Sequence, residues 1–220
     1  MGEQTVSIVE YPVHGRGSGP YGITAGPDQA VWFTEVHHGR VGRLGLGGEL
    51  TSFPLDPPSG RPSLLTTGPD GALWFTESRG HRIGRITTDG SITTFTTPSA
   101  EAGPFGIAPG PDGALWFTEL NADKIGRVTV DGTITEFPLP DRAARTHAIT
   151  ATPDGNCWFT EWGANRVGRI SPDGAVETYR LPTPASEPHG ITVGPDGALW
   201  VALEIGSIAR LAPTDQSDQR

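Results

Sequence analysis

Tryptophan recurs in this chain at a constant spacing of 42 residues, at Trp32, Trp74, Trp116, Trp158 and Trp200. A second aromatic series keeps the same spacing, at Tyr11, Phe53, Phe95, Phe137 and Tyr179. The repeated unit contains four short β-type runs, with Asp-Gly pairs such as 89–90 and 131–132 between the third and the fourth run. Asp-Gly between apolar residues is a strong hairpin signal. A repeat of about 40 residues with four strands predicts a β-propeller, because one such sheet cannot bury both its faces alone.

The five tryptophans predict a single all-β domain over residues 1–220, a five-bladed propeller with four antiparallel strands in each blade. The segment "TVSIVEYPV" (5–13) matches the fourth strand of a repeat, whereas "SIARLAP" (207–213) matches a third strand. We therefore expect the N-terminal strand to complete the last blade, which closes the ring and removes two exposed edges. The alternative is that this strand joins another chain by domain swapping. The polar residues 213–220 predict a flexible tail.

Composition excludes several classes of protein. The net charge of −9 and the pI of about 5.0 argue against a nucleic acid or an anionic membrane as partner. No run approaches the roughly 18 apolar residues of a membrane span, and the first residues do not have the pattern of a signal peptide. The single cysteine, Cys157, cannot form an intramolecular disulfide, which fits a reducing compartment. We expect a cytoplasmic monomer.

Residues that occur in every repeat are predicted to belong to the scaffold. The tryptophans are expected to pack between blades. Arginine recurs at 43, 85, 127 and 169, where we expect hydrogen bonds between blades or solvated surface. Glutamate ends each "WFTE" motif, at 35, 77, 119 and 161, and is also interpreted as structural.

Function is expected where the repeats differ. The position that opens the innermost strand is occupied in turn by Tyr21, Ser63, Phe105, His147 and His189. Innermost strands line the central channel of a propeller, so these side chains should ring one mouth of it. Two histidines in consecutive blades, beside a tyrosine across the closure, predict an asymmetric polar sector. The alternative is that both imidazoles are ordinary structural residues.

The fifth hairpin adds two carboxylates, Glu187 and Glu204. Simple pairing places His147 opposite Glu161 and His189 opposite Leu203, and it points Glu204 away from His189. The fifth repeat is one residue shorter after its tryptophan, which predicts a bulge that could redirect Glu204. Pro188 favours an extended Glu187, on the same side as His189.

Two carboxylates that converge beside one imidazole suit a hard divalent cation such as Mg²⁺, which takes only one or two protein carboxylates and keeps several waters. The alternative is a solvated loop in which both acids are free.

The segments "GPYGIT" (19–24), "THAITA…WFTEWGANRVGRI" (146–170) and "ASEPHGI…WVALEIGSIARL" (185–211) closely resemble the first, penultimate and final blades of the virginiamycin B lyase (streptogramin B lyase) family. The likeness covers nearly the whole chain. The combination of "EPHGI" with "ALE" is more specific than the general repeat motif. The family is built from seven blades, whereas this chain carries five repeats.

The resemblance implies a Mg²⁺-dependent lyase that opens the lactone ester of a cyclic depsipeptide antibiotic by elimination. By this resemblance His189 is the proton acceptor, His147 and Tyr21 contact the substrate, and Glu187 and Glu204 hold Mg²⁺. A neutral histidine is a suitable base at pH 7. Two alternatives stay open: a catalytically silent binding propeller that retains these residues, and a natural or engineered scaffold.

Overall fold

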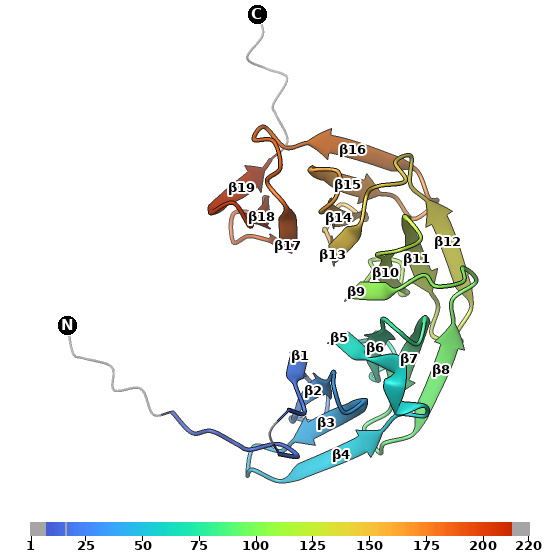
Figure 1. Cartoon of the computed structure of the whole chain (residues 1–220), viewed down its shortest axis with the longest axis vertical. Coiled ribbons are helices and arrows are strands. Elements are labelled where there is room, and N and C mark those ends of the chain that lie inside the picture. The colour runs from blue at the N-terminus through green and yellow to red at the C-terminus, as the bar shows by residue number, and fades with distance from the viewer. Residues whose placement is uncertain (1–7, 16, 213–220) are drawn as a thin grey trace, which may run out of the picture.

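The computed structural model describes residues 8–15 and 17–212, which form an all-β molecule of five antiparallel sheets. The sheets stand side by side along an open arc, with the strands β1, β5, β9, β13 and β17 at its inner side (Figure 1). The described part of the chain contains no helix that is long and apolar enough to cross a membrane.

Each of the first four sheets contains four strands in sequence order. The first sheet consists of β1 (Pro20–Ala25), β2 (Val31–Glu35), β3 (Arg40–Leu44) and β4 (Leu50–Pro54). A short 3₁₀ turn, η1 (Pro58–Gly60), leads to the second sheet, which consists of β5 (Pro62–Thr67), β6 (Leu73–Glu77), β7 (Arg82–Ile86) and β8 (Ile92–Thr96). The third sheet consists of β9 (Pro104–Pro109), β10 (Leu115–Glu119), β11 (Lys124–Val128) and β12 (Ile134–Pro138).

The fourth sheet consists of β13 (Thr146–Ala151), β14 (Cys157–Glu161), β15 (Arg166–Ile170) and β16 (Val176–Arg180). Within the described residues the fifth sheet has three strands, β17 (Pro188–Val193), β18 (Leu199–Leu203) and β19 (Ser207–Leu211). The repeat of 42 residues is thus a repeat of one sheet, as the sequence predicts.

Asp-Gly pairs make the predicted turns in the second, third and fourth sheets, and Gly47-Gly48 makes the equivalent turn in the first sheet. Between the third and fourth strands of the first four sheets the glycine has φ between +91° and +93°, a conformation that favours residues without a Cβ atom. In the second, third and fourth sheets this glycine also receives an aromatic ring from the preceding sheet: a Cβ atom on Gly132 would lie 2.0 Å from the ring of Phe95. The turn residue therefore also permits the packing of one sheet on the next.

The tryptophans pack between sheets, as predicted. Trp32, for example, belongs to one buried cluster with Leu65 and Phe75 of the second sheet. Each of the first four tryptophans also stacks on the aromatic residue of its own fourth strand, with ring centroids 5.4–5.7 Å apart. The first three tryptophans are therefore core residues, and Phe53, Phe95 and Phe137 of the second series pack partly buried against the core, whereas Tyr179 stays 41% exposed.

The recurring arginines form contacts within a sheet. Arg43 donates from Nε to Asp28 over 2.6 Å, and the same carboxylate accepts from the indole of Trp32 over 2.9 Å. Equivalent ion pairs join Arg85 to Asp70, Arg127 to Asp112 and Arg210 to Asp196. In the fourth sheet Arg169 instead pairs with Glu177, 3.4 Å away. The prediction of hydrogen bonds between blades is wrong for these residues, because the partner is a carboxylate of the same sheet.

The predicted closing strand does not form in the described part of the N-terminal segment. Residues 8–13 belong to no strand, and β19 has β18 as its only partner among the described residues. The first and fifth sheets lie at opposite ends of the arc (Figure 1). Residues 5–7 and the predicted tail at 213–220 lie outside the described residues.

Candidate functional site

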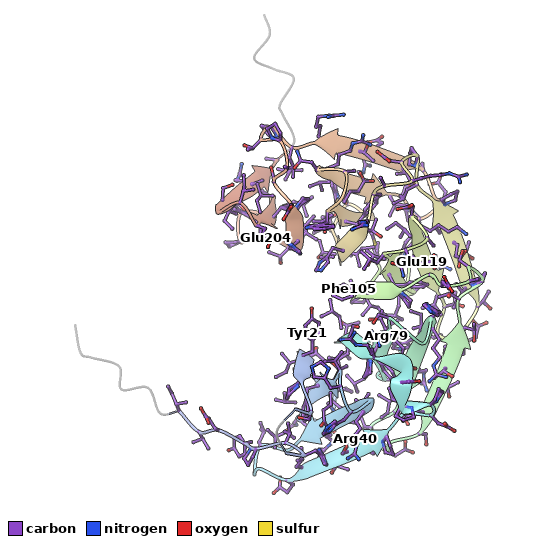
Figure 2. The ribbon with its side chains drawn as sticks, viewed as in Figure 1. Tyr21, Arg40, Arg79, Phe105, Glu119 and Glu204 are labelled. Carbon is purple, nitrogen blue, oxygen red and sulfur yellow. The ribbon has the colours of Figure 1, made fainter. Side chains whose placement is uncertain are left out.

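The side chains that open the innermost strands form a row along the inner side of the arc. The ring centroids of Phe105 and His147 are 4.5 Å apart, and those of His147 and His189 are 4.7 Å apart. Tyr21 reaches past Ser63 to Phe105 at 6.3 Å, and both rings point towards the open centre of the arc (Figure 2). The predicted grouping of the variable positions is therefore confirmed for these aromatic and imidazole side chains.

A threonine from each preceding sheet holds this row in place. The hydroxyl of Thr118 donates to the carbonyl of His147 over 2.9 Å, and that of Thr160 donates to the carbonyl of His189 over 2.8 Å. Thr34 and Thr76 make the same bond to the carbonyls of Ser63 and Phe105. The second residue after each of the first four recurring tryptophans thus has a specific role that sequence comparison of the repeats leaves unassigned. The fifth sheet has Ala202 at this position.

Pairing at the inner edge of each sheet differs from the predicted register. Thr146 pairs with Glu161 and Ile149 with Phe159, so His147 and Ala148 together stand opposite one residue. In the fifth sheet Pro188 pairs with Leu203, and His189 follows in the same irregular position. The predictions of His147 opposite Glu161 and of His189 opposite Leu203 are wrong by one residue. The cause is a β-bulge, which occurs in all five sheets and not in the fifth alone.

His147 is the more enclosed imidazole. Burial, followed by the neighbouring His189, lowers the pKa of His147 to about 4, so its ring is neutral at pH 7. Its Nδ1 atom is buried and has no hydrogen-bond partner in the described part of the chain. His147 can therefore contact a bound molecule as an uncharged polar group, but it is poorly suited to accept a proton at neutral pH.

His189 is paired with a carboxylate. Its Nε2 atom lies 2.6 Å from Oε2 of Glu204. Because a carboxylate only accepts hydrogen bonds, Nε2 carries the hydrogen of this pair and Nδ1 is left as a proton acceptor. The His189 side chain is 37% exposed and that of Glu204 60% exposed. The pair is accessible from solvent, as a base that meets a substrate must be.

The shortened repeat explains how Glu204 reaches His189. Leu203 pairs with Ser207, so three residues connect β18 and β19, whereas four residues connect β14 and β15. Gly206, with φ of +97°, is the last residue of this turn. The strand register is unchanged, because Trp200 still pairs with Arg210 as Trp158 pairs with Arg169. The missing residue therefore shortens the turn that carries Glu204. Because Glu204 lies in this turn and not in β18, the alternation of side chains along a strand does not decide where it points.

Glu187 adopts a different conformation from the predicted one. Its φ is +50°, in the left-handed region, although an extended backbone was expected before Pro188. The equivalent residues Gly19, Arg61, Gly103 and Arg145 have φ between +46° and +66°, so the chain requires this turn before every innermost strand. The carbonyl of Glu187 accepts a hydrogen bond from the backbone N–H of Glu204 over 3.2 Å. The two acidic residues are thus linked through their backbones.

Two open pockets share Trp162 and Arg145 as lining residues, and one of them is also lined by the two histidines. One has a volume of about 660 Å³ and is lined by His147, His189, Trp162, Arg145 and neighbouring residues. The other has a volume of about 320 Å³, and Glu187 lines it together with Trp162 and Arg145. The guanidinium of Arg145 lies 5.5 Å from the ring centroid of Trp162, and that ring is 6.3 Å from His189.

Trp162 and Arg145 are site residues that the sequence analysis missed. Trp162 is the one tryptophan of six outside the 42-residue series, which is a usable signal of a role other than packing. Arg145 could not be found in this way, because its proximity to Trp162 arises only from the turn before β13.

The donor set fits Mg²⁺ in chemistry. Glu187 and Glu204 supply hard carboxylate oxygens from backbone-linked residues, both at least partly accessible. Among the described residues no three or more histidine, cysteine or acidic side chains come together as a metal-binding group. Mg²⁺ is often held by one or two carboxylates and several waters, so a site with two protein ligands is compatible with it, and unsuited to a closed structural metal such as Zn²⁺.

Comparisons with known proteins place this chain in one family. The profile of the Virginiamycin B lyase family matches residues 4–211. A virginiamycin B lyase of Saccharopolyspora erythraea is 57% identical over 57 residues, which are 26% of this chain and 19% of that protein.

Solved structures extend the likeness to nearly the whole chain. A streptogramin B lyase structure is 47% identical, with a TM-score of 0.86, over 89% of this chain and 65% of the other. The catalytically inactive H270A virginiamycin B lyase of Staphylococcus aureus with quinupristin is 45% identical, with the same TM-score, over 90% of this chain and 67% of the other. This chain therefore spans about two thirds of the lyase structures it matches.

Proposed function

Because this chain belongs to the virginiamycin B lyase family, we propose that it opens the lactone ester of streptogramin B-type cyclic depsipeptides by elimination. The observation that carries the proposal is the His189–Glu204 pair, an accessible imidazole held by a carboxylate at 2.6 Å beside an open pocket. A related lyase with quinupristin supports a cyclic depsipeptide as substrate. We expect the protein to act in the cytoplasm.

Elimination requires a positioned base. Nδ1 of His189 removes the proton from the α-carbon of the threonyl residue, and the electron pair forms the double bond to the β-carbon. The bond between the β-carbon and the ester oxygen breaks, and the oxygen leaves as a carboxylate. No water is added. Glu204 stabilises the imidazolium that forms, since it accepts a hydrogen bond from Nε2 and carries the opposite charge.

The neighbouring side chains have supporting roles in this proposal. His147, neutral at pH 7, contacts the substrate next to the base. Trp162 offers an aromatic surface between the two pockets, and Arg145 stands over it as a cation. Tyr21 is the proposed substrate contact at the other end of the row.

Mg²⁺ is the proposed cofactor, with Glu187 and Glu204 as its ligands. When bound, it would supply a Lewis acid that stabilises negative charge developing on the substrate carbonyl. Glu204 has two carboxylate oxygens, and only Oε2 is engaged by His189. One carboxylate can therefore orient the base and still offer an oxygen to a cation.

The test is incubation with a streptogramin B antibiotic, with Mg²⁺ or with a chelator, followed by mass spectrometry. Elimination linearises the ring without a change of mass, whereas hydrolysis adds one water. We expect a linear product of unchanged mass that is lost on chelation. His189→Ala should abolish the product, while His37→Ala, which removes an exposed imidazole far from the pair, should not. Binding of the antibiotic without any turnover would support the silent binding propeller instead.

A further inference from the structure

Two positions of the repeat are joined by the same backbone hydrogen bond in every sheet. The residue that follows the second strand donates its N–H to the carbonyl of the residue that precedes the innermost strand, over 2.9–3.2 Å. The pairs are Val36 with Gly19, Ser78 with Arg61, Leu120 with Gly103, Trp162 with Arg145, and Glu204 with Glu187. The backbone contact is constant and the side chains differ, so these two positions present a different chemistry in each sheet.

The fourth and fifth sheets carry opposite charges at these two positions. In the fifth sheet both residues are acidic, Glu187 and Glu204, whereas in the fourth sheet they are Arg145 and Trp162. The two sheets are neighbours in the arc, with β13 beside β17 (Figure 1). An acidic pair on one sheet therefore stands next to a cation on the adjacent sheet.

The pocket that the two histidines line is more positive than the protein as a whole, whose net charge is −9. Its charged lining residues are Arg142, Arg145 and Asp123, and neither Glu187 nor Glu204 lines it. Asp123 accepts the backbone N–H of Arg145 on Oδ1 over 3.3 Å. Neither arginine makes an ion pair in the described part of the chain. The pocket is therefore suited to an anionic group.

Packing fixes the position of Arg145. Its neighbours Ala144 and Thr146 are fully buried, and its own φ is +46°. The guanidinium lies 5.5 Å from the ring centroid of Trp162, and a Cβ atom on Gly163 would lie 3.2 Å from Cγ of Arg145. A side chain held in this way loses little conformational freedom when it binds a ligand. The planar guanidinium matches the two oxygens of a carboxylate.

We propose that Arg145 binds the carboxylate that leaves during the elimination, an inference that rests on the proposed function. The bond between the β-carbon and the ester oxygen breaks, its electron pair stays on that oxygen, and the proton from the α-carbon stays on Nδ1 of His189. The leaving group is the conjugate base of an acid with a pKa of about 3.5, so it requires a cation and not a proton donor. Arg145 supplies that charge and two parallel hydrogen bonds.

The test compares the binding of two linear compounds made from one streptogramin B antibiotic. Chemical hydrolysis of the lactone gives the acid and ammonolysis gives the primary amide, so the two compounds differ only in the carboxylate. Isothermal titration calorimetry is done with a chelator, which prevents binding of the carboxylate through a metal ion. We expect the unchanged protein to bind the acid at least about 10-fold more tightly than the amide.

Three variants assign this preference to one side chain. Arg145→Gln should abolish it and lower kcat about 10²-fold, with an unchanged circular dichroism spectrum. Arg145→Lys should keep part of it, because an ammonium has the charge without the planar fork. Arg61→Gln is the matched control and should leave the preference unchanged. Arg61 holds the same position in the second sheet, with φ of +54° and the same hydrogen bond from Ser78.

The outcomes separate this inference from the proposed function. Equal affinity of the unchanged protein for the acid and the amide, while the antibiotic is still opened, would overturn the role of Arg145 and leave the proposed function standing. An equal loss of the preference in Arg61→Gln would overturn that role as well, because the effect would not depend on the pocket. If neither compound binds and the antibiotic stays cyclic, both the inference and the proposed function are wrong.

Discussion

At the scale of single residues, the glutamates that occupy the same position in the first four sheets lie in different surroundings. All four that end the second strands are fully buried. Glu77 is paired with Arg82 through two hydrogen bonds, but Glu119 has no hydrogen-bond partner in the described residues, because Lys124 binds Glu136 instead. Burial, and then the charge of Glu136, raises the pKa of Glu119 to about 8. The same position of the repeat therefore holds an acid with a cationic partner in the second sheet and an acid without a hydrogen-bond partner among the described residues in the third.

Glu119→Gln is expected to stabilise the protein increasingly as the pH rises from about 4.5 to about 8. In that interval the folded chain keeps a proton on Glu119 that the unfolded chain has released, so unfolding is favoured by rising pH. The gain should reach about 2–4 kcal/mol near pH 8 and vanish near pH 4. Urea unfolding at both pH values measures it. Equal midpoints for the variant and the parent at pH 8 would contradict the prediction.

Glu204→Gln is expected to lower kcat by about 10²-fold and to leave the thermal midpoint unchanged. The amide oxygen can still accept the hydrogen bond from Nε2 of His189, but no charge remains to stabilise the imidazolium or to bind Mg²⁺. Glu177→Gln, an exposed acid of β16 that contacts Tyr179 and Arg169, is the matched control. A variant with unchanged kcat would remove Glu204 from the mechanism.

At the scale of the strand, one hydroxyl organises each sheet interface. Thr160 of β14 accepts from the backbone N–H of Ala148 and donates to the carbonyl of His189. It therefore connects its own innermost strand to that of the next sheet, and both bonds lie beside the candidate site. Thr34 of β2 makes the same two bonds, to Gly22 and Ser63, far along the arc from His189.

Thr160→Val and Thr34→Val are both expected to cost about 1–3 kcal/mol, since each leaves backbone groups without partners. Only Thr160→Val should also lower kcat/KM for the antibiotic, because it releases the carbonyl that positions His189. Urea unfolding together with steady-state kinetics measures both effects. Equal kinetic losses in the two variants would mean that activity follows stability alone.

At the scale of the whole molecule, the five sheets form an open array in which each sheet contacts its neighbours in sequence. Stability in such an array is approximately a sum of nearest-neighbour terms, so a sheet with one neighbour is held less firmly than one between two. Within residues 8–15 and 17–212 the fifth sheet has only the fourth as neighbour, and its outer strand has no second partner. It also carries His189 and Glu204, which places the candidate site at the less supported end of the array.

Backbone amides of β18 and β19 are therefore expected to exchange with solvent faster than those of β10 and β11 in the central sheet. Hydrogen exchange followed by mass spectrometry tests this prediction. Uniform protection of the strands would show that the five sheets unfold as one unit.

Much of the candidate site could be predicted from the sequence, because its residues occupy positions that differ between otherwise similar repeats. The alignment of repeats selected Tyr21, His147 and His189, and the structure brings the two histidines into contact. The prediction that Glu204 could turn towards His189 is confirmed, although through a tightened turn. The roles of all five of these site residues, Tyr21, His147, Glu187, His189 and Glu204, and the binding of Mg²⁺ stay predictions.

The sequence by itself determined what repeats: the all-β class, the sheet as the unit, the turns, and the aromatic residues of the core. These follow from local patterns that recur every 42 residues. Only the tertiary structure decided the bulge that shifts every inner residue, the left-handed Glu187, and the open arc. These features depend on small rotations between packed sheets and on which partner each carboxylate contacts. A pattern of residue types along the chain does not specify either of them.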